Sequence, residues 1–285
     1  MKGFFDMLTM IEVLKAILFG VVEGITEWLP ISSTGHMILL DEFVKLNVSK
    51  EFLDLFLVVI QLGAILAVVV IYWNKLIPLS TKHGLHISRR KCKMWVKIIV
   101  ASIPAGVVGI LWDDVFTKYF YNYQTVAIML ILVGVVFIII ERSNKNKIAK
   151  IDSIDDISYD QAFLIGVFQM IAAIFPGTSR SGSTIVGSLM LGISRTAAAE
   201  FTFFLAVPAM FGGSAIKILK YSGGFNSAEV ALLAIGMIVA FVLSIIAIKF
   251  LMSYIKKHDF KVFGYYRIIL GALIILVALF KMLLG

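Results

Sequence analysis

Two glutamates, Glu23 and Glu27, lie four residues apart in a largely apolar stretch that runs from Ile17 to Pro30. At this spacing they share one face of a helix and repel each other. A charged side chain in the hydrocarbon core of a membrane costs about 2.5–3.5 kcal/mol on insertion scales. The pair therefore predicts a functional site in which something cationic offsets the two negative charges.

Polar side chains follow the glutamates at once, in the run Ser32-Ser33-Thr34-Gly35-His36. His36 lies three residues after Ser33, and the flexible Gly35 between them would let the ring reach the hydroxyl. That contact would permit base-assisted attack by serine, or proton delivery to a leaving group. The hydroxyls would otherwise cap a helix that begins here, and we expect at least one of the three to be only a cap.

A second polar cluster, from Pro176 to Thr184, lies in the other half of the chain and contains Arg180. Glycines and hydroxyl residues permit a turn whose N–H groups face one way and bind an anion, and a helix that restarts near Ser183 would point its positive end there. Arg180 offers a planar fork that suits phosphate oxygens. The predicted phosphate-binding residues are Ser32, Thr34, Gly177, Thr178, Ser179, Arg180, Ser181, Gly182 and Thr184.

An arginine at membrane depth needs an anionic partner, which is either the glutamate pair or a phosphorylated ligand. An internal Arg–Glu ion pair would by itself hold the two clusters together. The hydroxyl-rich, glycine-containing loop around Arg180 favours phosphate binding.

The glutamate pair also suits a hard divalent cation, which prefers oxygen ligands and often bridges a protein carboxylate to substrate phosphate. Such a cation would neutralise both the repulsion between the carboxylates and the charge of the phosphates. We predict Glu23 and Glu27 as metal ligands. The alternative for one of the two is a protonated, hydrogen-bonded glutamate.

Composition places these clusters in a membrane protein. The 285 residues are 60% hydrophobic and 15% charged, with a mean hydropathy of +0.97, which excludes an ordinary soluble domain. The net charge of +8 comes from loops between apolar segments, which fits cytoplasmic loops and anionic lipid headgroups rather than nucleic acid. The single cysteine, Cys92, excludes an internal disulfide.

Six apolar segments are long enough to cross a bilayer, since about 20 helical residues span its core. They are residues 56–73, 96–112, 124–140, 200–219, 229–249 and 265–284. Two further regions, 10–40 and 160–194, are broken near the middle by Pro30 and Pro176, and we interpret each as a helix pair that enters the membrane and returns. The predicted fold is an all-α integral membrane protein, a single domain 1–285 with six transmembrane helices and two re-entrant pairs.

Loop charge sets the predicted orientation, because cytoplasmic loops carry the excess of lysine and arginine. Loop 74–97 has seven such residues and no acid, and loop 249–261 is also basic, so both are expected inside. Loop 141–158 is mixed, with four basic and four acidic residues, but acids count little in this rule, so it is expected inside too. Loops 41–54 and 113–123 are slightly acidic and are expected outside. Both chain termini then lie outside.

Threading the chain through these loops gives halves 1–150 and 151–285 with the same order of elements and opposite orientation. This is an inverted repeat, in which a site forms where two broken elements meet near the midplane. A shift of 146 positions supports it by matching Gly20 with Gly166, Val21 with Val167, Glu23 with Gln169, Pro30 with Pro176 and Ser33 with Ser179. The apolar surroundings of Gln61 and Gln169 predict helix–helix hydrogen bonds for both.

The two clusters resemble the signature motifs of the undecaprenyl-diphosphate phosphatase family, the bacitracin-resistance proteins of bacteria. The first motif runs from Glu23 to His36 and the second from Pro176 to Gly182. The resemblance also takes in Gln61-Leu62-Gly63 and residues 200–208, and it extends from end to end at similar length.

The resemblance implies hydrolysis of undecaprenyl pyrophosphate to the monophosphate and inorganic phosphate on the outer face of the cytoplasmic membrane. This reaction recycles the lipid carrier of peptidoglycan assembly and confers bacitracin resistance. The resemblance also implies dependence on Mg²⁺ or Ca²⁺, and a similar fold. The site residues of the family fall on Glu23, Glu27, Ser33, His36 and Arg180.

Two questions stay open at this point. The phosphorus is attacked either by Ser33, through a phosphoserine, or directly by water. The rival function is a transporter or flippase of a polyprenyl phosphate, since inverted repeats with broken helices also build transporters.

Gly106 and Gly109 would serve a helix interface in a homodimer.

Overall fold

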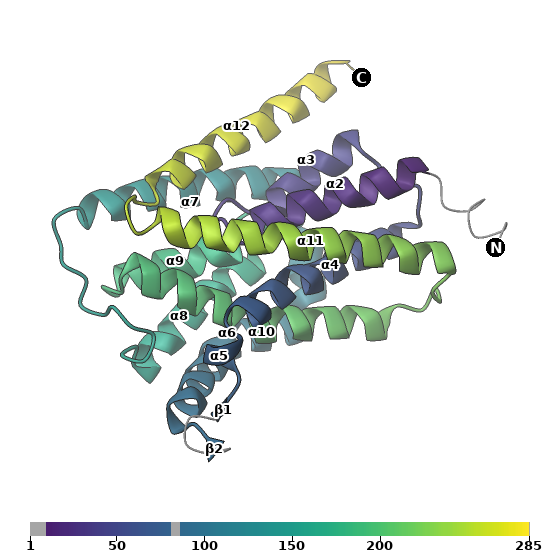
Figure 1. The fold of residues 1–285 in the computed structure, drawn as a ribbon. Coiled ribbons are helices and arrows are strands. Elements are labelled where there is room, and N and C mark those ends of the chain that lie inside the picture. The colour runs from purple at the N-terminus through teal and green to yellow at the C-terminus, as the bar shows by residue number, and fades with distance from the viewer. Residues whose placement is uncertain (1–9, 81–85, 285) are drawn as a thin grey trace.

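The computed structural model describes residues 10–80 and 86–284, and these are helical apart from one short hairpin (Figure 1). The helices are α2 Met10–Thr26, α3 Ser33–Phe43, α4 Lys50–Ile71, α5 Trp73–Leu76, α6 Arg89–Phe120, α7 Tyr123–Ser143, α8 Tyr159–Ile174, α9 Arg180–Met190, α10 Arg195–Lys220, α11 Ser227–Tyr254 and α12 Lys261–Leu284. Strands β1 Leu79–Ser80 and β2 His86–Ile87 pair antiparallel. The N-terminal end of the chain, whose side was predicted, lies outside the described residues, as does Lys82 of the basic loop.

The predicted all-α fold with six membrane helices is confirmed. Within the described residues, six helices are long and apolar enough to cross a membrane: Lys50–Ile71, Arg89–Trp112, Tyr123–Ser143, Arg195–Lys220, Ser227–Tyr254 and Lys261–Phe280. They are α4, the greater part of α6, then α7, α10, α11 and the greater part of α12.

The helix ends differ from the predicted ends because polar caps, not the apolar runs, set them. The predicted span 56–73 is α4, which begins at Lys50 after Ser49 accepts a hydrogen bond from the Phe52 N–H at 3.1 Å. Ser158 and Asn226 close capping boxes before α8 and α11. The first turns of these helices therefore contain charged residues, and the helices begin earlier in the sequence than their apolar runs.

Each broken region consists of two helices joined by a turn, α2 with α3 and α8 with α9. Ser32 and Ser179 end these turns with positive φ angles of 74° and 69°. Each side chain caps the following helix by accepting from the backbone N–H three residues on, at Gly35 and Gly182. The passage of each pair into the membrane and back stays a prediction.

The two caps correct the predicted register of the repeat. Ser179 lies 147 positions after Ser32, so Arg180 corresponds to Ser33, and both are the first residues of 11-residue helices. The shift of 146 still matches Glu23 with Gln169, which are both buried. The stretch from Pro176 to Ser179 is therefore one residue longer than the stretch from Pro30 to Ser32, and this moves arginine into the position of the serine.

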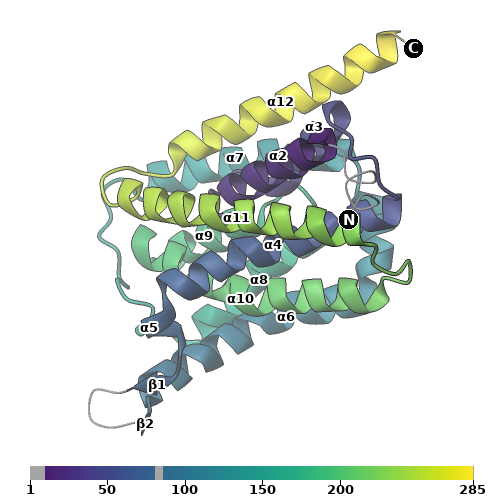
Figure 2. The same cartoon turned by 45° about the vertical axis from the view of Figure 1, so that its right-hand side comes forward.

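Contacts between the halves are reciprocal. A Cβ on Gly134 of α7 would lie 2.7 Å from the Gly264 carbonyl of α12, and a Cβ on Gly264 would lie 2.7 Å from the Gly134 carbonyl. Gly20 of α2 meets α11 in the way that Gly166 of α8 meets α6, each against a backbone carbonyl. Figure 2 shows α12 along α7, and α11 between α2 and α4. Such reciprocity is what a two-fold repeat requires.

Side chains beneath these contacts fix the helices around the turns. Trp28 is fully buried in the first turn and packs edge-on against Phe203 of α10, with ring centroids 5.3 Å apart. Glu141 of α7 accepts from Arg195 of α10 at 2.9 and 2.5 Å and from the Phe260 N–H at 3.0 Å. The two broken pairs are thus held against a packed helical frame.

Candidate active site

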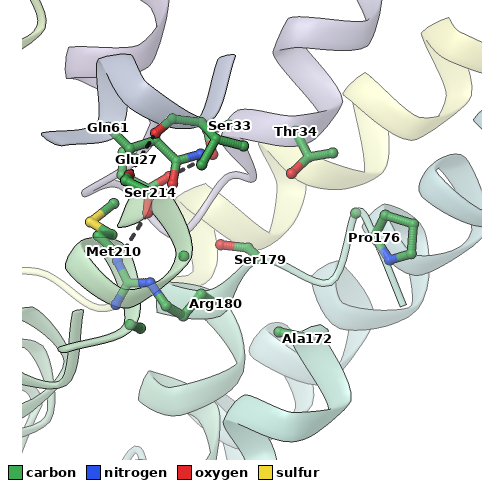
Figure 3. Close-up of a pocket in the computed structure, with 14 residues that line it drawn as sticks. Glu27, Ser33, Thr34, Gln61, Ala172, Pro176, Ser179, Arg180, Met210 and Ser214 are labelled. Atoms are coloured by element: carbon green, nitrogen blue, oxygen red, sulfur yellow. Dashed lines mark hydrogen bonds and ion pairs between the residues drawn. The ribbon is translucent and has the colours of Figure 1, made fainter. Parts of the chain in front are cut away.

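A cavity of about 250 Å³ lies where the two turns meet (Figure 3). Its polar wall comes from both halves: Glu27, Ser33 and Thr34 from the first, and Ser179 and Arg180 from the second. Gly177, Gln61 and Ser214 also line it. The structure therefore brings the two sequence clusters to one place.

Glu27 joins the two clusters. Its Oε2 accepts a hydrogen bond from the Ser33 hydroxyl at 2.6 Å, and its Oε1 pairs with Arg180 Nη2 at 2.9 Å. The carboxylate is buried, with 8% of the residue exposed. Glu27 is thus the anionic partner that a buried arginine requires, and it is placed to accept the proton of the Ser33 hydroxyl.

Arg180 keeps donors for a ligand after this pairing. A guanidinium has five N–H donors, and hydrogen bonds are formed by Nη1, to the Thr202 carbonyl at 3.1 Å, and by Nη2, to Glu27. The side chain extends from α9 towards Glu27 at the edge of the cavity (Figure 3). Its remaining donors suit the oxygens of a phosphate.

Two helix N-termini meet at this cavity. Ser33 and Thr34 form the first turn of α3, Arg180 begins α9, and all three line the cavity. The first N–H groups of a helix have no partner within the helix and carry its positive end. The capping serines satisfy only the N–H groups of Gly35 and Gly182. The cavity therefore has the arrangement that suits an anion, with one helix N-terminus from each half of the chain.

Glu23 lies one turn before Glu27 and does not line this cavity. The residue is 1% exposed, and within the described residues its Oε1 has no hydrogen-bond partner. An orphaned carboxylate oxygen beside a second carboxylate fits a divalent cation. No group of three or more His, Cys, Asp or Glu side chains that could hold a metal occurs among the described residues. An ion here would take its other ligands from substrate phosphate and water.

His36 does not contact Ser33, so the predicted Ser33–His36 hydrogen bond is not formed. Its Nδ1 lies 2.8 Å from the Ser32 carbonyl, and its Nε2 lies 2.7 Å from the Tyr266 hydroxyl, whose ring stacks on the imidazole. The carbonyl can only accept, so Nδ1 carries the proton and Nε2 accepts from tyrosine. Packing of α3 against α12 places the ring against Tyr266, His36 does not line the cavity, and the carboxylate beside the Ser33 hydroxyl is that of Glu27.

Several predicted phosphate-binding residues support the turns instead of lining the cavity. Ser32 is a cap, as expected for one of the three hydroxyls. Ser181 donates from α9 to the Glu27 and Leu29 carbonyls at 3.3 and 3.4 Å. Thr184 bonds to the Arg180 carbonyl and the Thr202 hydroxyl. Thr178 and Gly182 are also buried behind the wall.

Gly177 of the same set lines the cavity and must be glycine. Its φ is +89°, and a Cβ there would lie 2.5 Å from the Val126 carbonyl oxygen. Ser179 lines the cavity while it caps α9.

Sequence reasoning missed Arg267, which lies inside a predicted span. The residue is fully buried and donates to the carbonyls of Gly177 at 2.8 Å, Thr178 at 2.9 Å and Pro30 at 3.3 Å. It therefore fastens both turns with one guanidinium. A lone arginine in an apolar helix was the available signal.

The predictions for the two glutamines are wrong. Within the described residues, no hydrogen bond is formed by Gln61, which lines the cavity beside Ser33 and Glu27 (Figure 3). Gln169 is buried, and its Oε1 has no partner there. Gln61 thus offers a free amide to whatever fills the cavity.

Comparisons with known proteins show the family of the chain. The family model described as bacitracin resistance protein BacA matches residues 16–273. A protein of Desulfitobacterium hafniense named undecaprenyl-diphosphatase is 62% identical over 94% of this chain and 97% of its own. Undecaprenyl-diphosphatase 1 of Clostridium acetobutylicum is 61% identical over 93% of this chain and 97% of its own length. An undecaprenyl-diphosphatase of Enterococcus faecalis is 57% identical over 95% of this chain and 98% of its own length.

Proposed function

The chain belongs to the bacitracin resistance protein BacA family, and we infer that it is an undecaprenyl-diphosphatase of the membrane. It hydrolyses undecaprenyl pyrophosphate to undecaprenyl phosphate and inorganic phosphate. The reaction recycles the lipid carrier of cell-wall synthesis and gives resistance to bacitracin. The observation that carries this assignment is the meeting of Ser33 and Arg180 on the Glu27 carboxylate, at the positive ends of two helices.

The diphosphate headgroup binds in the cavity. Arg180 contributes its unused N–H donors, and the N-termini of α3 and α9 add the positive ends of two helix dipoles. Gln61 donates its free amide to a phosphate oxygen. Phosphoryl transfer depends mostly on positioning and charge neutralisation, and these groups supply both.

Ser33 is the nucleophile in this proposal. Its Oγ forms a bond to the terminal phosphorus while its proton passes to Glu27 Oε2, which already accepts the hydroxyl hydrogen bond at 2.6 Å. The bond from phosphorus to the bridging oxygen breaks, and undecaprenyl phosphate leaves. Glu27 passes its proton to the departing phosphate. Water then attacks the phosphorus of phosphoserine while Glu27 takes a proton from it, the bond from phosphorus to Ser33 Oγ breaks, Glu27 returns that proton to Ser33 Oγ, and inorganic phosphate leaves.

Glu23 and Glu27 would hold a divalent cation, Mg²⁺ or Ca²⁺. When bound, the ion supplies positive charge that offsets both the carboxylates and the pyrophosphate. The orphaned Glu23 oxygen supports this assignment. The role of His36 in the proposal is to position the turn, because its proton is donated to the Ser32 carbonyl.

The cavity opens towards the outer face in this proposal. Val58 in the first half of α4 and Gln61 at its middle line it, as do Gly213 and Ser214 of the second half of α10. They lie away from the end of α4 that precedes loop 74–97 and from the start of α10 beside loop 141–158, whose Lys150 N–H donates to the Gly192 carbonyl. Both loops are expected inside. Both termini would then lie outside.

Phosphate release by the purified protein tests the function. Wild type in detergent with Mg²⁺ should release phosphate from undecaprenyl pyrophosphate, and Glu27→Gln and Arg180→Ala should not. Binding of the lipid without phosphate release would contradict the enzyme and favour a transporter. Arg195→Ala, which breaks an ion pair with Glu141 outside the cavity, is the matched control.

A further inference from the structure

The cavity is too small for the whole substrate. Its volume of about 250 Å³ equals that of roughly eight water molecules at about 30 Å³ each. A diphosphate headgroup fits this space, but a C55 prenyl chain does not. The chain must therefore leave through the wall of the cavity and reach lipid.

One part of the wall is formed mostly by small residues, with Met210 as the exception. Ala209, Met210, Gly213 and Ser214 of α10 line it at spacings that place them on one helix face. Ala172 and Pro176, at the end of α8, line the same cavity. We call the gap bounded by Ala172, Pro176, Ala209 and Gly213 the portal.

The portal lies inside the membrane span and borders lipid-facing surface. Gly213 lies in the last third of the span Arg195–Lys220, one turn before Lys217, and is exposed. Large apolar side chains near it on α10 are also exposed: Phe211 at 42%, Ile216 at 43% and Leu219 at 85%. Exposed apolar side chains on a membrane span lie next to lipid, so a chain that passes Gly213 enters the bilayer near one of its surfaces.

Gly213 is the residue that keeps the portal open. A Cβ at this position would meet nothing within 4 Å, so the space beside it is empty. Gly212 is equally exposed and equally unobstructed, but it does not line the cavity. The two adjacent glycines therefore differ in one property, which is their place relative to the cavity.

We propose that the portal between α8 and α10 is the binding site for the first part of the prenyl chain, and that the absent side chain of Gly213 admits that chain. The proposal rests on the proposed function for its ligand. The hydrophobic effect gives no gain for moving a chain between lipid and an apolar protein wall. The portal consequently acts by shape: it accepts a linear chain and excludes chains that are bulky next to the diphosphate.

A bulky residue at position 213 tests the proposal. Gly213→Phe should lower kcat/KM for undecaprenyl pyrophosphate relative to methyl diphosphate, which has no chain to pass, by about tenfold or more. Gly212→Phe, the matched control, should leave that ratio within about twofold. Gly213→Ala and Gly213→Leu should fall between in order of side-chain volume. Equal loss for both substrates, or the same loss in Gly212→Phe, would overturn the portal.

A second measurement needs no turnover, which separates the portal from the proposed function. In a Cys92→Ser background, which removes the one native cysteine, undecaprenyl phosphate should slow maleimide modification of Gly213→Cys by about threefold or more, in line with burial of the thiol. Undecaprenyl phosphate should leave the rate of maleimide modification of Gly212→Cys unchanged. Absence of protection at position 213 overturns the portal. Protection in a protein that releases no phosphate from any diphosphate overturns the enzymatic function and leaves the portal standing.

Discussion

Ser33 and Arg180 occupy the same position in the two halves of the chain, and both donate to the carboxylate of Glu27. Each is the first residue of an 11-residue helix that follows a capping serine with positive φ. Their distances to Glu27 are 2.6 and 2.9 Å. One structural element, used twice, thus supplies the nucleophile of the proposed mechanism in one half and its phosphate-binding cation in the other.

Replacing Glu27 should slow the chemical step. Glu27→Gln keeps the shape but cannot take the Ser33 proton, so kcat should fall by about 10²–10⁴. The assay is steady-state phosphate release at saturating lipid. Glu200→Gln, a glutamate paired with Lys75 at 2.7 Å and outside this cavity, is the control and should keep its kcat. A Glu27→Gln variant with normal kcat would remove the base from the mechanism.

Ser33 should carry phosphate during turnover. Rapid acid quench of wild type with substrate labelled at the terminal phosphate should trap label on the protein, and Ser33→Ala should trap none and lose activity. Ser179→Ala removes the equivalent cap in the other half and should still trap label. Full activity of Ser33→Ala would instead favour direct attack by water.

Arg180 should be more than a positive charge. Arg180→Lys keeps the charge but loses the planar fork, so kcat/KM should fall by about a hundredfold. Arg195→Lys makes the same exchange in the Glu141 ion pair outside the cavity and should change kcat/KM little. Equal effects of the two substitutions would mean that Arg180 has only a structural role.

Part of this site follows from the sequence for a physical reason. Charges at membrane depth require partners, and this predicts that Arg180 pairs with the glutamates or with a phosphorylated ligand. The structure pairs it with Glu27, although 153 positions separate the two residues. Proline and glycine breaks likewise predict the two turns. Both features arise from local residue chemistry that acts whatever the details of packing.

The remaining features depend on how the last helix packs, and no local pattern gives that. α12 brings Tyr266 to the ring of His36 and Arg267 to the carbonyls of both turns. The proximity of His36 and Ser33 in sequence suggested a pair that this packing prevents. The register of 147 at the caps also required the structure, because one extra residue between the proline and the capping serine leaves no periodic signal.

Divalent cations should be required, and Glu23 should set their affinity. Chelation should abolish phosphate release by wild type, and Mg²⁺ should restore it. Glu23→Gln removes the negative charge of the carboxylate whose Oε1 has no partner among the described residues. It should raise the Mg²⁺ concentration for half-maximal rate by about tenfold or more. Glu200→Gln is again the control. A metal requirement that is identical in wild type and Glu23→Gln would contradict metal binding at Glu23.

Gly177 should be needed for the stability of the second turn. Alanine there adopts an unfavourable φ of +89° and places Cβ 2.5 Å from the Val126 carbonyl, at a cost of about 1–3 kcal/mol. The apparent Tm in detergent should fall by roughly 2–4 °C for each kcal/mol. Gly109→Ala is the matched control, since its Cβ would meet nothing within 4 Å in the middle of α6, and it should raise the apparent Tm slightly because alanine favours helix.

Because Gly177 lines the cavity and its carbonyl accepts from Arg267, the destabilised turn should also release the guanidinium and lower kcat. A Gly177→Ala protein that melts and turns over like wild type would show that the turn relaxes without strain.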